Sequence, residues 1–180
     1  MVDAKADDTQ TTPAKAKSGA AEAPAGQAKN QAPAGPPVPK VTVRTQYVKD
    51  LSFENPGAPK SFADAAGPPQ IKVNVDVETK PLGGNHYEIA LKINATAKQK
   101  AVTVFVTELS YAGLFALENI PKDRLETVCV VECPRLLFPF ARRVIADATR
   151  DGGYPPLLLD PIDFRRLYRQ HRTSAGASAA

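Results

Sequence analysis

Residues 71–95 read IKVNVDVETKPLGGNHYEIALKINA, and their pattern points directly to a fold class. Residues 71–78 alternate between apolar side chains at the odd positions and polar side chains at the even positions. The same alternation resumes over residues 87–95, after a turn that contains one proline and two glycines. A period of two is typical of a strand with one buried face, and a glycine-rich turn favours an antiparallel hairpin. The pattern therefore predicts two neighbouring strands of an antiparallel sheet.

Two further segments extend the predicted sheet. Residues 41–49 have the composition of a strand and are expected to pair with the hairpin. Residues 101–111 are partly apolar on both faces, with valines on one face and Phe105, Leu109 and Tyr111 on the other. A strand of this kind is covered either within its own domain or by another chain. Because one sheet and few helices are predicted, we expect a contact between subunits.

Two helices are predicted after the strands. The first has Pro139 in its opening turn, where a missing N–H costs little, and it ends at residues 151–153, which read Asp-Gly-Gly. The second begins at Asp160, a candidate N-cap, with Pro161 at the first helical position. The predicted fold is therefore α+β, a four-stranded antiparallel sheet followed by two helices.

The composition changes sharply near residue 40. Residues 1–40 contain eleven Ala, six Pro and three Gly, and they contain no aromatic residue, Leu or Ile. Such a segment buries too little apolar surface to offset the entropy lost on ordering. We therefore expect a disordered leader over residues 1–40, a single domain over residues 41–172 and a disordered tail over residues 173–180.

The N-terminus lacks the features of a targeting segment. It has no apolar run long enough for a secretory signal, and Asp3, Asp7 and Asp8 stand where such a signal is positively charged. No window approaches the roughly 20 apolar residues that cross a bilayer. The sequence predicts a soluble, cytoplasmic chain without stable membrane insertion.

The motifs of common enzymes are missing from the sequence. Cys129 and Cys133 have a C-x₃-C spacing that matches neither a zinc knuckle nor a redox pair, so we interpret them as buried, reduced thiols. Gly83 and Gly84 lie between two strands, whereas a phosphate-binding loop joins a strand to a helix. The scattered carboxylates single out no catalytic pair. We therefore expect no enzyme activity, no catalytic residue, no metal and no cofactor.

Four separate blocks of the chain form a recognisable series. Residues 47–56 read YVKDLSFENP, and Glu108 is followed by AGLF at residues 112–115. Residues 133–142 read CPRLLFPFAR, and residues 155–164 contain PPLLL followed by PIDF. In this order, the blocks resemble the SecB family of protein-export chaperones.

The resemblance, which extends from about residue 41 to residue 171, implies an assembly and a function. The assembly is a homotetramer, a dimer of dimers with the first helices packed between the sheets. The function is that of an ATP-independent holding chaperone, which binds unfolded precursors of exported proteins and delivers them to the SecA motor. The acids that the resemblance assigns to SecA binding are Asp50, Glu54 and Glu108. The residues expected in the tetramer interface are Thr107, Leu109, Tyr111, Ala141, Val144, Ile145 and Ala148.

A holding chaperone needs exposed apolar surface that unfolded chains can bind. The candidates are apolar residues at predicted strand ends, loops and helix entrances, namely Phe53, Phe62, Leu114, Phe115, Leu117, Leu125, Phe138 and Leu157. Phe62 could serve where some relatives have a tryptophan, since this chain has none. Ordinary core packing is the alternative for each of the eight, and solvated surface charge is the alternative for the three acids.

Three other classes of function stay open. The first is an assembly module whose apolar surfaces are wholly used between subunits, and the second is an enzyme with a site that the sequence does not reveal. The third is an RNA-binding protein that uses Arg165, Arg166, Arg169 and Arg172, although such a run is also typical of a solvated helix face. We expect no nucleic-acid partner. Two features depart from well-known SecB relatives, which are acidic: the pI is about 9.1, and residues 173–180 carry no acid.

Overall fold

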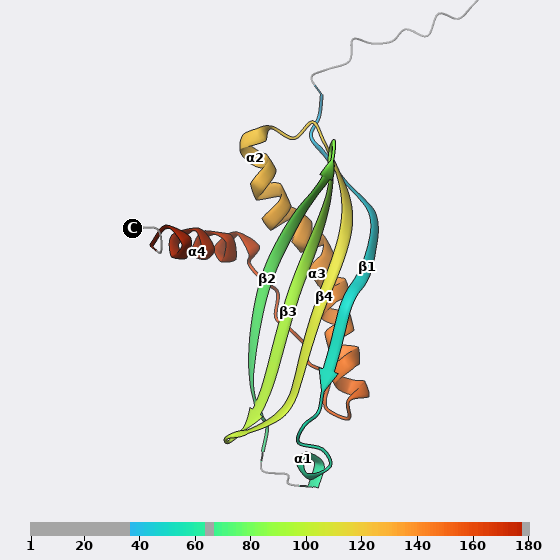
Figure 1. Cartoon of the computed structure of the whole chain (residues 1–180), viewed down its shortest axis with the longest axis vertical. Coiled ribbons are helices and arrows are strands. Elements are labelled where there is room, and N and C mark those ends of the chain that lie inside the picture. The colour runs from blue at the N-terminus through green and yellow to red at the C-terminus, as the bar shows by residue number, and fades with distance from the viewer. Residues whose placement is uncertain (1–36, 64–66, 178–180) are drawn as a thin grey trace, which may run out of the picture. The chain divides into compact units, whose positions relative to one another are not determined.

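The computed structural model describes residues 37–63 and 67–177. The prediction of a disordered leader over residues 1–40 lies outside the described residues up to residue 36, and it is wrong at its last residue, because Lys40 is paired with Glu118 in the sheet. The strands form one antiparallel four-stranded sheet, as the alternating pattern predicts, and the longer helices follow it (Figure 1). A short helix that was not predicted, α1 (Lys60–Ala63), lies between the first two strands. The strands are β1 (Lys40–Glu54), β2 (Gln70–Gly83), β3 (His86–Gln99) and β4 (Val102–Glu118). Their order in the sheet is β1-β4-β3-β2, so β1 and β2 form its two edges.

β1 and β4 are longer than their sequence patterns predict. Register shifts between Val43 and Thr45 and between Val48 and Asp50 break the alternation of β1, so its second half does not follow the same period. β4 continues to Glu118, beyond its predicted end at Tyr111, because β1 pairs with it on one side and β3 on the other. Strand ends here are set by the neighbouring strands.

One face of the sheet, the inner face, is covered by α3 (Cys133–Asp151), and the opposite one is the outer face (Figure 1). β3 shows the division most clearly, because Ile89, Leu91 and Ile93 are buried on the inner face while Lys92 is exposed on the outer face. The hydrophobic core therefore lies between the inner face and the helices.

The apolar side of β4 belongs to this core. Thr107, Leu109 and Tyr111 are 0%, 2% and 8% exposed, and they lie on the inner face. We expected another subunit to cover these side chains, but they are buried within the same chain, where Leu109 and Tyr111 share a core cluster with the buried stripe of α3. Glu108 is exposed on the outer face between them.

A continuous helical segment connects the sheet to the last helix. It consists of α2 (Lys122–Thr127), the π-helical turn η1 (Val128–Glu132) and α3. The prediction that this helix opens at Pro139 is wrong, since Pro139 lies inside α3 on its exposed side and Pro134 occupies the first turn. The helix begins before Pro139 because a stripe of buried residues, spaced four apart, packs α3 against the sheet from Cys133 onward. The residues of this stripe are Cys133, Leu137, Ala141, Ile145 and Thr149.

The last helix, α4 (Phe164–Ala177), also differs from its prediction. Its N-cap is Asp163 rather than Asp160, because a carboxylate oxygen of Asp163 accepts hydrogen bonds from the backbone N–H groups of Arg165 (3.0 Å) and Arg166 (3.1 Å). Residues 173–177, which we expected to be disordered, continue α4, and residues 178–180 lie outside the described chain. No helix within residues 37–63 and 67–177 is long and apolar enough to cross a membrane.

Gly113 of β4 lets α3 approach the sheet closely. A Cβ at this position would lie 2.8 Å from Cδ2 of Leu137 and 2.8 Å from Cε2 of Phe115. We predict that Gly113→Ala lowers the free energy of unfolding by about 1–3 kcal/mol, because the added methyl group overpacks the core. Urea unfolding at a fixed protein concentration measures the change.

A double-mutant cycle tests the cause. In a Leu137→Ala background, the same Gly113→Ala substitution is expected to cost less, because its nearest neighbour on α3 is gone. An equal cost in both backgrounds would show that contact with α3 is not the reason for the glycine.

Candidate functional site

Four aromatic rings gather at one end of the sheet and form what we call the aromatic cluster: Phe53 of β1, Phe62 of α1 (Lys60–Ala63), Phe105 of β4 and Tyr154. The ring centroids of Phe53 and Phe105 lie 5.6 Å apart, and that of Tyr154 lies 5.0 Å from Phe105 and 5.1 Å from Phe62. Phe105, at the buried side of the cluster, is 2% exposed, whereas Phe62 is 51% exposed. The cluster thus runs from the core to the surface.

Two glycines after α3 make room for the cluster. A Cβ at Gly152 would lie 2.3 Å from the ring of Phe53, and Gly153 has a φ of +88°, which favours glycine. The hydroxyl of Tyr154 donates a hydrogen bond to Oδ1 of Asn55 (2.7 Å) and lies 2.9 Å from Oγ of Ser61. Tyr154 therefore ties the segment after α3 to the segment after β1.

Thr149, the last residue of the α3 stripe, holds the connector between α3 and α4. Its hydroxyl donates to the backbone oxygen of Ile145 (3.0 Å) and accepts a hydrogen bond from the backbone N–H of Leu157 (2.9 Å). Thr149 is fully buried, so these bonds are made away from water. Leu157, a predicted groove residue, is half-buried as a result.

The structure separates the eight predicted groove residues into two groups. Phe115, Leu117 and Phe138 are buried in the core at 0%, 4% and 8% exposure, so the prediction that they lie at a surface is wrong. The physical reason is that β4 continues through the first two and α3 already includes the third. The remaining candidates are exposed or half-buried: Phe53, Phe62, Leu114, Leu125 and Leu157.

Sequence reasoning missed two members of the aromatic cluster. Phe105 follows the inner-face alternation of β4, and Tyr154 precedes two prolines in the connector. The usable signal was the pair of glycines before Tyr154, since Gly-Gly after a helix indicates a sharp turn and close packing. Which rings meet at that turn depends on the pairing of β1 with β4.

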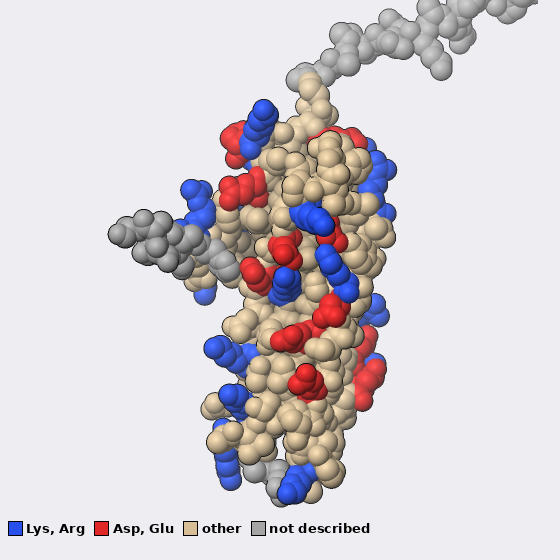
Figure 2. Space-filling model, in the orientation of Figure 1, with Lys and Arg blue, Asp and Glu red and all other residues tan. Residues whose placement is uncertain are grey.

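The three acids predicted to bind SecA lie together on the outer face. Asp50 pairs with Ser110 and Glu54 with Val106 in the register of β1 and β4, and Glu108 of β4 lies between these pairs, opposite Ser52. The Glu108 carboxylate accepts a hydrogen bond from the side-chain amide of Asn94. Within the described residues, no lysine or arginine forms an ion pair with any of the three acids. Figure 2 shows acidic side chains along this face.

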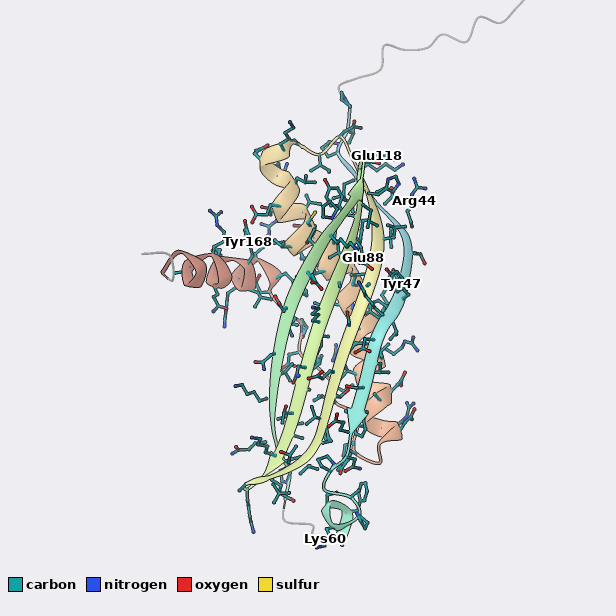
Figure 3. All side chains as sticks on the ribbon, in the orientation of Figure 1. Arg44, Tyr47, Lys60, Glu88, Glu118 and Tyr168 are labelled. Atoms are coloured by element: carbon teal, nitrogen blue, oxygen red, sulfur yellow. The ribbon has the colours of Figure 1, made fainter. Side chains whose placement is uncertain are left out.

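Two other acids of the outer face are neutralised by lysines. Lys49 lies 2.9 Å from Glu88, and Lys92 lies 2.9 Å from Glu78. The hydrogen bond from the Tyr47 hydroxyl is the largest cause of a lowered pKa of Glu88, and the hydrogen bond from Lys49 is the second. The hydrogen bond between Tyr47 and Glu88 also raises the pKa of the Tyr47 hydroxyl. Figure 3 shows Tyr47 of β1 reaching toward Glu88 of β3. Within the described residues, Asp50, Glu54 and Glu108 are therefore outer-face acids without an ion-pair partner, and the exposed Asp76 of β2 is another.

The two cysteines are free and buried, as predicted. Burial raises the pKa of the Cys129 thiol to about 11 and, with a smaller effect of nearby negative charge, that of Cys133 to about 12. Both thiols are therefore protonated at neutral pH and are poor nucleophiles. Among the described residues, no three His, Cys, Asp or Glu side chains form a group that could hold a metal ion.

Comparisons with known proteins agree on one family. Residues 34–175 match the family model described as preprotein translocase subunit SecB. The protein-export protein SecB of Parvibaculum lavamentivorans is 55% identical over 142 residues, which cover 79% of this chain and 84% of the relative. The protein of the same name from Maricaulis maris is 50% identical over 141 residues, which cover 78% of this chain and 82% of the relative.

A solved structure matches the fold. It is the SecB-like chaperone of Mycobacterium tuberculosis in complex with a peptide from an antitoxin, and it aligns with a TM-score of 0.54 at 17% sequence identity. The alignment covers 68% of this chain and 90% of the other. At this identity the match concerns the fold alone.

The buried thiols predict a loss of stability in alkali. An unfolded chain releases the thiol protons near the ordinary pKa of 9.0, whereas the folded chain keeps them to about 11 and about 12. The contribution is therefore fully present below pH 9, and we expect the free energy of unfolding to fall above it by up to about 1.4 kcal/mol per pH unit for each thiol. Urea unfolding between pH 8 and alkaline pH measures the slope. A Cys129→Ala/Cys133→Ala variant should show a shallower slope, and an identical slope in both proteins would contradict the assignment.

Proposed function

This chain belongs to the SecB family of preprotein translocase subunits, and we propose that it acts in protein export as a holding chaperone. In this proposal, it binds unfolded precursors of exported proteins in the cytoplasm, uses no nucleotide and delivers its clients to the SecA motor. It carries out no chemistry of its own, in keeping with the protonated state of both thiols.

The observation that carries the proposal is the partly exposed aromatic cluster. An unfolded chain exposes apolar side chains that a native protein keeps buried, so an apolar surface distinguishes the two without reading a sequence. Each buried side chain of leucine or phenylalanine size contributes roughly 1.5–3 kcal/mol. Phe62 exposes half of its surface beside Phe53 and Tyr154, and we propose that client side chains bind against these rings.

Holding follows from mass action. A protein that binds the unfolded state of its client lowers the concentration of free unfolded chain and delays folding, with no energy input. Weak contacts at several sites along one long client raise the overall affinity through effective concentration. We propose Leu114, Leu125 and Leu157 as further contacts, because each keeps part of its apolar surface accessible.

The proposed homotetramer supplies these repeated sites. Five of the seven interface residues predicted from sequence are buried within one chain: Thr107, Leu109, Tyr111, Ala141 and Ile145. They would therefore not contact another subunit directly and would only pack against the residues that do. Val144 and Ala148 of α3 remain half-exposed, and Leu136 and Phe140 on the same helix are each 45% exposed. This outward side of α3 is the surface that we propose for the contact between subunits.

Delivery to SecA is proposed to use Asp50, Glu54 and Glu108. Their carboxylates share the outer face and have no lysine or arginine partner within the described residues, so they are available to a basic partner. Exposed charges of this kind guide encounter and set register more than they add affinity. The outer face is opposite to the face that α3 covers, so an outer-face partner would not have to displace α3.

The central experiment is capture of a slow-folding secretory precursor. The full chain is mixed with the precursor, unfolded or native, and complex formation and aggregation are measured. Selective binding of the unfolded form supports the proposal. A stable oligomer that binds neither form would instead favour an assembly module.

For the aromatic cluster, we predict that Phe62→Ala combined with Leu157→Ala weakens binding of the unfolded precursor by at least about tenfold, since two apolar contacts are lost. Phe62 is half-exposed, so its removal should change stability little. Leu82→Ala is the matched control, because Leu82 is 49% exposed at the opposite end of the sheet. Unchanged binding by the double variant, with native circular dichroism, would exclude these residues from the client site.

For the acids, we predict that Asp50→Asn combined with Glu108→Gln weakens SecA binding about tenfold at low salt and leaves precursor binding unchanged. The difference should shrink as the salt concentration rises, because exposed charges are screened. Asp123→Asn with Glu126→Gln removes two exposed acids of α2 and serves as the control. If both double variants lose the same affinity, net charge rather than the outer-face position would be responsible.

A further inference from the structure

The net charge of the protein comes from one helix. α4 carries four arginines and no acidic residue, while the rest of the chain carries 19 basic and 19 acidic side chains. The formal charge of +4 is therefore the charge of α4. A helix with this composition at the end of an otherwise balanced chain is a candidate binding surface for an anion.

The arginines lie on one side of α4. At 3.6 residues per turn, Arg165, Arg166, Arg169 and Arg172 fall within an arc of about 120°, and all four are exposed. We call this arc the arginine face. The apolar residues lie on the opposite side: Phe164 is 2% exposed, and Leu167 and Tyr168 are half-buried next to Val77 and Val130.

Among the described residues, contacts within the chain neutralise Arg165 and leave the other three arginines of the face without a carboxylate partner. Arg165 forms an ion pair with Glu132 at 3.2 Å, which links the start of α4 to η1. The guanidinium of Arg172 lies 5.8 Å from the centroid of the Tyr168 ring. Within the described residues, Arg166, Arg169 and Arg172 have no carboxylate partner. Asp163 at the helix start accepts hydrogen bonds from the backbone N–H groups of Arg165 and Arg166.

We propose that the arginine face binds an anionic phospholipid surface. Guanidinium groups form paired hydrogen bonds with phosphate, and a straight helix edge matches a flat sheet of headgroups. The apolar side of α4 is already packed against its own chain, so the helix would adsorb on the headgroups and would not insert. Each arginine near such a surface strengthens binding about fivefold, so the contact is weak for one chain and reversible.

A membrane fits the arginine face better than RNA does. Proteins that hold single-stranded RNA combine basic groups with aromatic rings on which bases stack. α4 offers no such ring, because Phe164 is buried and Tyr168 is half-buried with Arg172 over its face. The arginine face therefore offers positive charge without stacking rings, and positive charge is attracted to a surface of closely spaced anionic headgroups.

The biological role that we infer for membrane binding rests on the proposed export function, whereas the binding of the arginine face to phospholipid does not depend on it. An export chaperone delivers its client at a membrane, and weak adsorption would concentrate it there before it meets the motor. The acids of the outer face and the arginine face belong to different elements, so one chain could use both at the same time.

The test uses the full chain and sedimentation with phosphatidylcholine vesicles, with and without phosphatidylglycerol. We expect binding only to vesicles that contain phosphatidylglycerol, and we expect it to weaken steadily with added salt. The variant Arg166→Gln/Arg169→Gln/Arg172→Gln should lose affinity on the order of 100-fold. Arg165 is retained because its ion pair with Glu132 holds α4 in place. Circular dichroism and urea unfolding verify that the variant is folded.

The matched control removes three exposed lysines of the sheet, Lys72→Gln/Lys80→Gln/Lys98→Gln, and should stay within a few-fold of the original affinity. Equal losses in the two triple variants, or binding that does not depend on phosphatidylglycerol, would overturn the proposal. Salt-sensitive binding of an RNA oligonucleotide without vesicle binding would also overturn it. Precursor capture is measured in parallel: vesicle binding without capture contradicts only the chaperone function, and capture without vesicle binding contradicts only the arginine face.

Discussion

The close packing of α3 on the inner face of the sheet is the contact on which the other features depend. Leu137, Ala141 and Ile145 are fully buried on one stripe of the helix, and Gly113 on β4 lets that stripe approach. Burial of this apolar surface is the main favourable term in folding, and it consumes the inner side of β3 and β4 within a single chain. The remaining surfaces, namely the outer face, the end of the sheet and the outward side of α3, are what the protein has left for partners.

The end of α3 determines where the aromatic cluster forms. Thr149 ends the buried stripe and anchors the connector through the backbone of Leu157, and the two glycines that follow α3 turn Tyr154 toward Phe53. The cluster is thus continuous with the core at Phe105 and open to solvent at Phe62. A client bound there would extend an existing apolar packing, which requires little reorganisation of the chaperone.

The sequence predicted those elements whose pattern is local. The β2–β3 hairpin follows from its own alternation. The spacing of Cys129 and Cys133 matches no zinc or redox motif, and the default interpretation as buried thiols is confirmed. It failed where a neighbour decides the outcome. Two register shifts in β1 change which side chains face inward, and only the pairing with β4 reveals that Phe115 lies in the core. The N-cap shows the same limit: Asp160 and Asp163 are chemically equivalent candidates, and the path of the connector selects the second.

The candidate site was predictable to a similar extent. The resemblance singled out Asp50, Glu54 and Glu108, and the register places all three on one face, although residues 50 and 108 are far apart in sequence. The overall composition does not reveal where the charges lie, because a pI of about 9.1 suggests a generally basic protein. The net positive charge resides in α4, because the rest of the chain has equal numbers of basic and acidic side chains. Within the described residues, no arginine of α4 forms an ion pair with Asp50, Glu54 or Glu108. Apolar contacts depend little on salt, whereas both charged surfaces are screened by it. The proposed client binding at the aromatic cluster and the proposed docking through the charged surfaces would therefore respond to different physical conditions, which would allow one chain to hold a client while it gains or loses its other partners.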